Sequence, residues 1–161
     1  MYKRQALAVF DPAPEVLEGD GARFATESPA AFDRILLDAP CTGLGALRRR
    51  PEARWRKSPR DVAELTALQS ALLDSAIAAL KPGGLLAYVT CSPHLAETRG
   101  VVADARERHG DLLEPQATAD TLQSIAVERL DLAGEGDTVQ LWPHRHLTDG
   151  MFIALLRKRA A

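Results

Sequence analysis

The chain has 161 residues, of which 46% are hydrophobic and 26% charged, and its formal net charge is −2. This composition is typical of one soluble globular domain and excludes a polycation that coats nucleic acid or an anionic membrane over its whole surface. No apolar run reaches the roughly 20 residues that cross a bilayer, and the start lacks a secretory signal pattern, so we expect a cytoplasmic location and no membrane partner. Two cysteines, Cys41 and Cys91, are too few for a disulfide framework, and the histidines have no metal-ligand spacing with them.

The first predicted elements are a short strand and then a strand, helix, strand unit. A short strand ending in a tight turn is expected over 14–21, and an apolar run bounded by prolines predicts a buried strand over 32–38. Apolar residues recur at helical spacing over 60–80, after a Ser-Pro start signal, and a second buried strand is predicted over 85–90. At this length the unit is a right-handed crossover between parallel strands.

The remaining predicted elements complete an α/β fold. A helix is expected from Ala96 to about His109, followed by a hairpin whose strands cover 138–142 and 151–156 and whose connection is 143–150. The sequence therefore predicts a layered sheet with an antiparallel element at its end. In open sheets of this kind, ligands bind at the carboxyl ends of the strands.

Each cysteine comes just after a predicted buried strand. Asp38-Ala39-Pro40-Cys41 ends the first, and Thr90-Cys91-Ser92-Pro93 ends the second. The crossover would bring two thiols that are 50 positions apart to the same rim of the sheet. An isolated free cysteine is more often a small buried hydrophobic residue, but this paired placement, with Asp38 beside one thiol, favours a chemical role.

These motifs resemble the RsmB/Nop (Fmu/Sun) group of RNA cytosine-5 methyltransferases, which use S-adenosylmethionine. The two cysteine motifs, in this order, carry the resemblance over roughly Leu17 to Arg99. Further matching features are Thr42-Gly43, Arg48-Arg49-Arg50-Pro51, Trp55, Gln69 and Lys81-Pro82-Gly83-Gly84, with a weaker echo in Trp142-Pro143-His144 and Asp149-Gly150-Met151-Phe152. The resemblance implies a Rossmann-like methyltransferase fold, of which this chain would carry the carboxyl-terminal half of the sheet with its terminal antiparallel hairpin.

The resemblance also implies roles for four residues. The Cys91 thiolate would add to carbon 6 of cytosine, so that carbon 5 can attack the sulfonium methyl of S-adenosylmethionine, and Cys41 would aid the later release step. Asp38 would contact the cofactor and hydrogen-bond the base, and Asp20, within Gly-Asp-Gly at the end of the first predicted strand, would contact the adenine end of the cofactor. A lone Gly-Asp-Gly is otherwise typical of a turn.

A local basic segment, from Arg48 to Arg60, lies beside this predicted pocket. It has seven basic residues against one acid, Glu52, and is placed to hold RNA phosphates, whereas its structural alternative is a solvated charged loop. The candidate RNA-binding residues are Arg48, Arg49, Arg50, Arg54, Trp55, Arg56 and Lys57, with Pro40 as a wall of the base pocket. By resemblance, the RNA is ribosomal. Gly43-Leu44-Gly45 lacks the third glycine of a nucleotide loop and is interpreted as part of the substrate loop.

One expected part of a methyltransferase is missing. Only 18 residues precede Gly19, and they contain no glycine-rich cofactor turn. We therefore expect 1–161 to be a partial class I methyltransferase catalytic domain. Two alternatives stay open: an RNA-binding remnant without catalysis, and a subunit that is completed by a separate cofactor-binding chain. The sequence does not indicate an oligomeric state.

Overall fold

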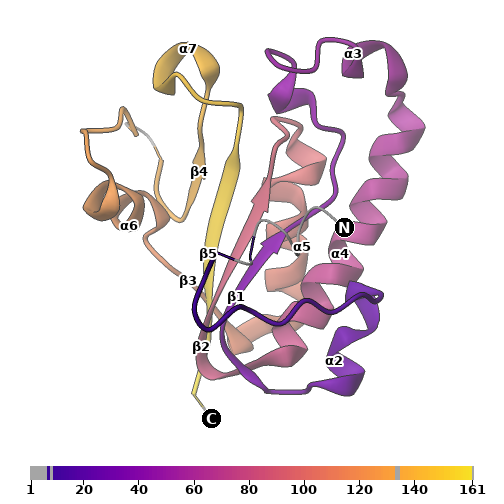
Figure 1. The fold of residues 1–161 in the computed structure, drawn as a ribbon, viewed down its shortest axis with the longest axis vertical. Coiled ribbons are helices and arrows are strands. Elements are labelled where there is room, and N and C mark those ends of the chain that lie inside the picture. Colours follow the sequence, from indigo (N-terminus) through magenta and orange to yellow (C-terminus); the bar gives the residue numbers. More distant parts are fainter. Residues whose placement is uncertain (1–6, 8, 133–134, 161) are drawn as a thin grey trace.

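The computed structural model describes residues 7, 9–132 and 135–160, and it has a five-stranded sheet with helices packed on it (Figure 1). The strands are β1 (Phe32–Asp38), β2 (Leu80–Thr90), β3 (Leu113–Pro115), β4 (Thr138–Gln140) and β5 (Phe152–Lys158). The helices are α2 (Phe24–Glu27), α3 (Ala53–Arg56), α4 (Pro59–Ala79), α5 (Arg99–His109), α6 (Thr118–Ile125) and α7 (Pro143–His146). Short 3-10 turns are η1 (Gly21–Arg23), η2 (Leu44–Ala46), η3 (Leu95–Glu97) and η4 (Gly110–Leu112).

The predicted crossover unit is confirmed as β1, α4 and β2. β1 and β2 pair in parallel, with Ile35 opposite Leu86. α4 begins with Pro59 in its first turn and a capping box, in which Asp61 accepts hydrogen bonds from the backbone and hydroxyl of Ser58. The parallel pairing places the carboxyl ends of both strands at one edge of the sheet.

The predicted terminal hairpin is also confirmed. β5 pairs antiparallel with β4 on one side and with β2 on the other, and its connection to β4 contains the short helix α7. Thr90 lies opposite Phe152, so the residues that precede β5 reach the carboxyl end of β2. The helix predicted over 96–109 is divided into η3 and α5, because the backbone of Thr98 leaves helical geometry.

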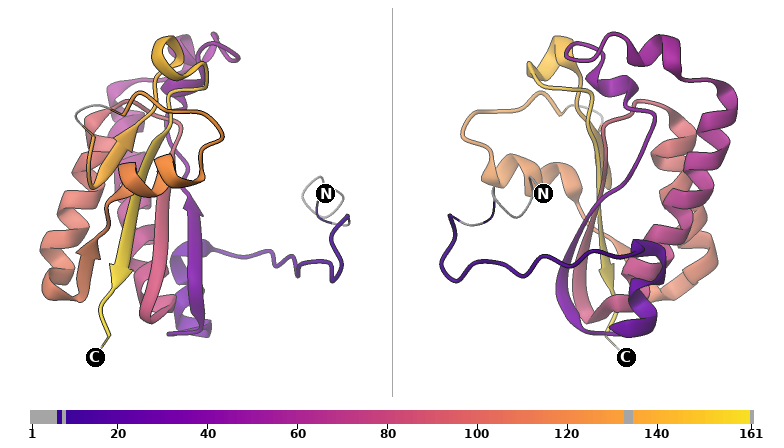
Figure 2. Two further views of the ribbon diagram at one scale, coloured as in Figure 1. Left: turned by 90° about the vertical axis from the view of Figure 1, so that its left-hand side faces the viewer. Right: turned by 45° about the vertical axis from the view of Figure 1, so that its right-hand side comes forward.

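The core lies between the sheet and one helical layer. α4 and α5 cover one face, whereas α6 lies against β4 and β5 on the other (Figure 2). α4 is long and apolar enough to pass as a membrane-spanning helix by composition, but core helices meet the same criterion, and Leu73 and Ile77 of α4 are fully buried against the sheet. On the sheet, Leu86 and Tyr88 of β2 complete this cluster.

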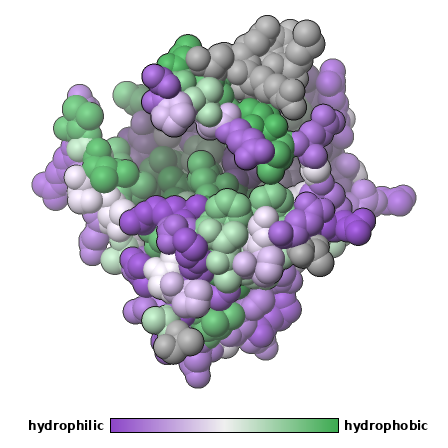
Figure 3. Space-filling model, turned by 60° about the horizontal axis from the view of Figure 1, so that its bottom comes forward, coloured by the Kyte–Doolittle hydropathy of each residue, from purple (hydrophilic) through white to green (hydrophobic). Residues whose placement is uncertain are grey.

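Two expectations from the sequence are wrong. Residues 14–19 form no strand, because their backbone has no ladder partner among the described residues. β1 is not buried either: it is an edge strand, no described strand pairs with its outer edge, and Leu36 is 71% exposed. A parallel strand is buried only when neighbours cover both its faces, and here α4 covers one. Figure 3 shows apolar side chains gathered around a hollow on the lower face of the molecule.

Candidate active site

The two cysteines meet at the carboxyl edge of the sheet. Cys41 follows β1 and Cys91 follows β2, and their Sγ atoms are 3.3 Å apart, although 50 positions separate them along the chain. A hydrogen bond from the backbone N–H of Ala39 to the carbonyl of Val89, 2.9 Å long, extends the strand pairing to the start of the cysteine loops. The crossover therefore brings the thiols together as the sequence predicts.

The contact gives the two sulfur atoms different protonation behaviour. A hydrogen bond from Cys41, the largest effect, lowers the pKa of the Cys91 thiol to about 7, although partial burial and the charges of Asp38 and Asp149 oppose it. The hydrogen bond to Cys91, together with burial, raises the pKa of Cys41 far above its ordinary range. These opposite shifts favour Cys91 over Cys41 as the thiolate of the pair near neutral pH.

Both thiols line a cavity of about 760 Å³. The cavity is large enough for a nucleobase and has a mixed polar and charged lining. Its lining residues are Asp38, Ala39, Pro40, Cys41, Thr42, Gly43, Ala46, Arg49, Arg50, Glu52, Ala53, Arg56, Lys57, Cys91, Asp149 and Met151. The structure thus brings together the predicted residues Asp38, Pro40, Cys41 and Cys91 with part of the basic segment.

Asp149 fixes the basic segment to the cavity wall. Arg49 donates from Nε to Asp149 Oδ2 over 2.8 Å, and a second guanidinium nitrogen donates to the same oxygen. Arg48 Nη2 lies 3.7 Å from Oδ1. These hydrogen bonds, above all those from Arg49, hold the pKa of Asp149 below its usual range. The sequence marked Asp149 only as a weak echo of the family, because its partner is 100 residues away.

Two glycines let the loops of the site touch through their backbones. The N–H of Gly45 donates to the carbonyl of Cys91 over 2.9 Å, and the N–H of Gly150 donates to the carbonyl of Gly45 over 2.8 Å. A Cβ atom at Gly45 would lie 1.9 Å from the Gly150 carbonyl oxygen and 2.8 Å from that of Cys91. Gly45 therefore allows close packing between the loops, whereas Gly43 is needed for its positive φ of 73°.

A buried carboxylate behind the cysteines is the main feature that the sequence reasoning missed. Glu97, at the end of η3, is fully buried and accepts hydrogen bonds from Thr42, Ser92 and Gln69. In the sequence, only its position six residues after Cys91 could have pointed to Glu97. Two of its three partners lie 28 and 55 residues away, so no local pattern indicates the contacts.

The basic segment stands at the mouth of the cavity and is exposed. Trp55 is 82% exposed, and the guanidinium carbon of Arg54 lies 5.1 Å from its ring centroid, a cation–π contact. Arg50, Arg56 and Lys57 line the cavity, whereas the remaining candidates Arg48, Arg54 and Trp55 lie outside its lining. An exposed aromatic ring among guanidinium groups offers both a stacking surface and phosphate contacts.

Asp20 is not brought into this cavity. Its exposed side chain caps η1 by accepting a hydrogen bond from the backbone N–H of Ala22 over 3.0 Å, and η1 packs against α4. Its role at the cofactor stays a prediction. In the part of the chain that the structure describes, no group of three or more histidine, cysteine or acidic side chains could hold a metal ion.

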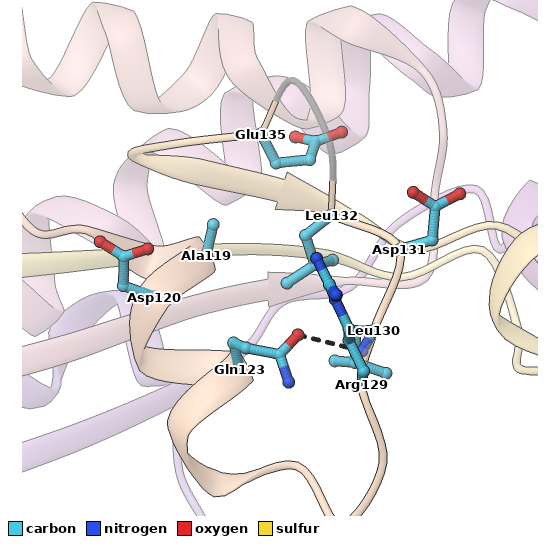
Figure 4. Close-up of a pocket in the computed structure, with 8 residues that line it drawn as sticks. All are labelled: Ala119, Asp120, Gln123, Arg129, Leu130, Asp131, Leu132 and Glu135. Carbon is cyan, nitrogen blue, oxygen red and sulfur yellow. Dashed lines mark hydrogen bonds between the residues drawn. The ribbon is translucent and has the colours of Figure 1, made fainter.

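A second cavity, of about 550 Å³, lies between α6 and the segment that precedes β4 (Figure 4). Gln123 of α6 accepts a hydrogen bond from the backbone N–H of Leu130 over 3.0 Å. Two acidic residues of the cavity lining also form ion pairs: Glu135 pairs with Arg99, and Asp131 pairs with Arg145. Three of its polar side chains hold the segment in place and its lining has no thiol, so this cavity is not the candidate site.

Comparison with known proteins identifies the family of this chain. A sequence profile of the family described as 16S rRNA methyltransferase RsmB/F matches residues 6–157. The chain belongs to the RsmB/F family. Among curated relatives, "Putative methyltransferase Rv1407" of Mycobacterium tuberculosis is 57% identical over 144 residues, which cover 89% of this chain and 30% of that protein. Ribosomal RNA small subunit methyltransferase B of Erwinia tasmaniensis is 38% identical over 151 residues, which cover 90% of this chain and 31% of that protein.

Solved structures give the same fold. The structure of NSun6 from Pyrococcus horikoshii with SFG matches with a TM-score of 0.71 and 30% identity, over 91% of this chain and 35% of that one. The crystal structure of PH0851 matches with a TM-score of 0.69 and 35% identity, over 81% of this chain and 27% of that one. The RsmB/F chain therefore has the Rossmann-like methyltransferase fold, and it spans about 30% of the length of the curated relatives that it matches.

Proposed function

We propose that this RsmB/F chain carries the base-binding and nucleophilic part of an RNA cytosine-5 methyltransferase that acts on ribosomal RNA with S-adenosylmethionine. The observation that carries the proposal is the contact between Cys91 and Cys41, one sulfur available as a thiolate and the other held as a thiol, in a base-sized cavity beside a basic segment. The rRNA methyltransferase names of its relatives support the substrate class.

The first step belongs to Cys91. Its thiolate forms a bond from Sγ to carbon 6 of cytosine, and the electron pair of the 5,6 double bond moves toward carbon 5. Asp38, which lines the cavity, is the residue that we assign to the ring nitrogen of the base, where a shared proton makes carbon 6 more electrophilic. S-adenosylmethionine, when bound, supplies the electrophilic methyl group that carbon 5 receives.

The release step belongs to Cys41. The negative charge of Cys91 contributes to the high pKa of Cys41, and this charge disappears when Sγ of Cys91 is bonded to the base. The pKa of Cys41 then falls, so Cys41 releases its proton to solvent, and its thiolate is the base that takes the proton from carbon 5. The electron pair of that C–H bond reforms the double bond, and the bond between Cys91 and carbon 6 breaks to return the thiolate.

The chain has two carboxylates suited to the cofactor. Asp38 lines the cavity at the open edge of β1, and Asp20 is exposed on η1. Carboxylates accept hydrogen bonds from amino groups, of which S-adenosylmethionine has two, so these residues fit the group. The SFG in the NSun6 structure is an S-adenosylmethionine analogue, which supports the same choice of cofactor.

Trapping of the covalent adduct tests the proposal. Labelled ribosomal RNA and S-adenosylmethionine are incubated with the chain, and with a chimera in which the chain replaces the matching segment of the Mycobacterium tuberculosis relative. Denaturing gels then detect protein bound covalently to RNA. We expect Cys41→Ala to accumulate the adduct and Cys91→Ala to abolish it.

The controls separate the alternatives. Cys41→Ala combined with Cys91→Ala must remove the adduct that Cys41→Ala accumulates. An adduct that survives Cys91→Ala would refute the nucleophile assignment. RNA binding that weakens with salt, without an adduct from either protein, would instead favour the RNA-binding remnant.

A further inference from the structure

Glu97 has the hydrogen-bond environment of a structural hub. Its side chain is fully buried, and each carboxyl oxygen accepts from two donors. Oε1 accepts from the backbone N–H of Thr42 over 2.8 Å and from Nε2 of Gln69 over 3.3 Å. Oε2 accepts from the hydroxyl groups of Thr42 and Ser92, each over 2.6 Å. A carboxylate has about four acceptor positions, and here donors use all of them.

Three of these four donors come from the two cysteine loops, and the fourth, Gln69, comes from α4. Thr42 directly follows Cys41, and Ser92 directly follows Cys91, so one carboxylate joins the two residues next to the reacting thiols. In each loop, the residue that bonds to Glu97 is the immediate neighbour of the cysteine. Movement of either loop relative to Glu97 therefore changes the distance between the sulfur atoms.

The hub is itself held from two sides. Gln69 of α4 also donates to the carbonyl of Pro40 over 2.8 Å, which ties the Cys41 loop to the core helix. The hydroxyl of Tyr88, a buried residue of β2, donates to the backbone carbonyl of Glu97 over 2.9 Å. Glu97 is thus fixed to the sheet and to α4 rather than to a mobile surface loop.

We propose that Glu97 is the positioning residue that sets the contact between Cys41 and Cys91, and so determines which sulfur is the nucleophile. The consequence of this role for methyl transfer rests on the proposed function above, whereas its effect on the reactivity of the two thiols does not depend on that function. Without the hub, the sulfur atoms separate, and Cys91 loses the hydrogen bond from Cys41 that favours its thiolate.

The choice of substitutions follows from the donors. Glu97→Ala removes the carboxylate that four buried donors share, which destabilises this arrangement of the loops. Glu97→Gln keeps one carbonyl oxygen for Thr42 and Gln69, and its amide can donate to the two hydroxyl groups, because hydroxyl groups also accept. Ser92→Ala removes one donor and leaves the carboxylate in place. Thr118→Val is the matched control, because Thr118 is an equally buried hydrogen-bonding residue under β5, far along the chain from either cysteine.

The experiment measures the rate of Cys91 alkylation by iodoacetamide against pH, with the site identified by mass spectrometry. The unchanged chain should have a midpoint near pH 7, and Glu97→Ala should move it toward the ordinary thiol value near 9. At pH 7 the rate should then fall roughly five- to tenfold, because the thiolate fraction drops about fiftyfold while each thiolate becomes more nucleophilic. Glu97→Gln should restore most of the midpoint, and Ser92→Ala should move it part of the way.

Circular dichroism reports which variants fold. If Glu97→Ala does not fold, the alkylation midpoint of Ser92→Ala tests the proposal. A Cys91 midpoint that stays near 7 in the folded Glu97→Ala or Ser92→Ala variants, or that moves equally in Thr118→Val, overturns the proposal. If the midpoints move as expected but the unchanged protein forms no RNA adduct, the proposed function fails and the positioning role of Glu97 stands.

Discussion

One hydrogen bond between two thiols distinguishes the residues that carry the proposed chemistry. Cys41 and Cys91 have the same side chain and lie at the same edge of the sheet. Their pKa values are nevertheless shifted in opposite directions from the ordinary thiol value, upward for Cys41 and downward for Cys91. A nucleophile needs the thiolate form near neutral pH, and a later base needs its proton until the adduct exists. The lowered pKa of Cys91 matches the first requirement, and the raised pKa of Cys41 matches the second.

The donor role of Cys41 can be tested without RNA. In Cys41→Ala the hydrogen bond that lowers the pKa of Cys91 is lost, while burial and the nearby acidic charges that raise it remain. The pH midpoint for alkylation of Cys91 should therefore rise from about 7 to about 9 or above, measured with iodoacetamide between pH 6 and 10. Cys41→Ser, whose hydroxyl also donates, serves as the comparison and should give a midpoint between the two. A midpoint that stays at 7 in Cys41→Ala would contradict the donor role.

At this scale the sequence predicts individual side chains unevenly. Asp38 is the last residue of β1, and Cys41 and Cys91 follow β1 and β2, so their meeting could be predicted. The partners of Glu97 and Asp149 could not, because each depends on contacts made by loops that are distant in sequence. A buried Glu has no local pattern that distinguishes it from an exposed one.

At the scale of elements, the loops after β1 and before β5 interlock through Gly45 and Gly150. We expect Gly45→Ala to lower the free energy of unfolding by about 3 kcal/mol, because its Cβ would overlap backbone atoms that cannot rotate away. Urea denaturation measures this loss. Gly136→Ala is the matched control, since its Cβ would have no neighbour within 4 Å, and it should change the free energy by less than about 1 kcal/mol. Equal effects of the two substitutions would argue against the interlock.

The regular elements that the sequence predicted correctly each had a strong local pattern, whereas α2, α3, β3 and α6 were not predicted. Helical periodicity with a capping signal gave α4, and apolar runs gave β1, β2 and the terminal hairpin. The prediction that β1 is buried was wrong for a physical reason. An apolar run indicates that a strand can be covered, but it does not indicate whether a neighbouring strand or helix covers it. The expected strand over 14–21 depended on turn residues alone, and a strand also needs a partner.

At the scale of the whole molecule, the net charge of −2 conceals a local basic surface at the mouth of the cavity. Arg54→Gln and Arg56→Gln should each reduce the slope of log affinity for single-stranded RNA against log salt by about 0.7, if each arginine holds one phosphate. Fluorescence anisotropy over a salt series measures the slope. Arg106→Gln on α5 removes the same charge from another exposed surface and should leave the slope unchanged. A slope that responds equally to all three substitutions would mean that only total charge matters.

The contacts that assemble the site have a consequence for how the chain folds. The two sulfur atoms are separated by 50 residues, the Glu97 to Thr42 bonds by 55, and the Arg49 to Asp149 pair by 100. Closing such long loops costs entropy that only a nearly complete sheet repays. The site is therefore among the last parts of the molecule to form, and an unfinished chain exposes two ordinary, weakly reactive thiols. The lowered pKa of Cys91 depends on its contact with Cys41, so we expect it only in a chain that has reached the native topology.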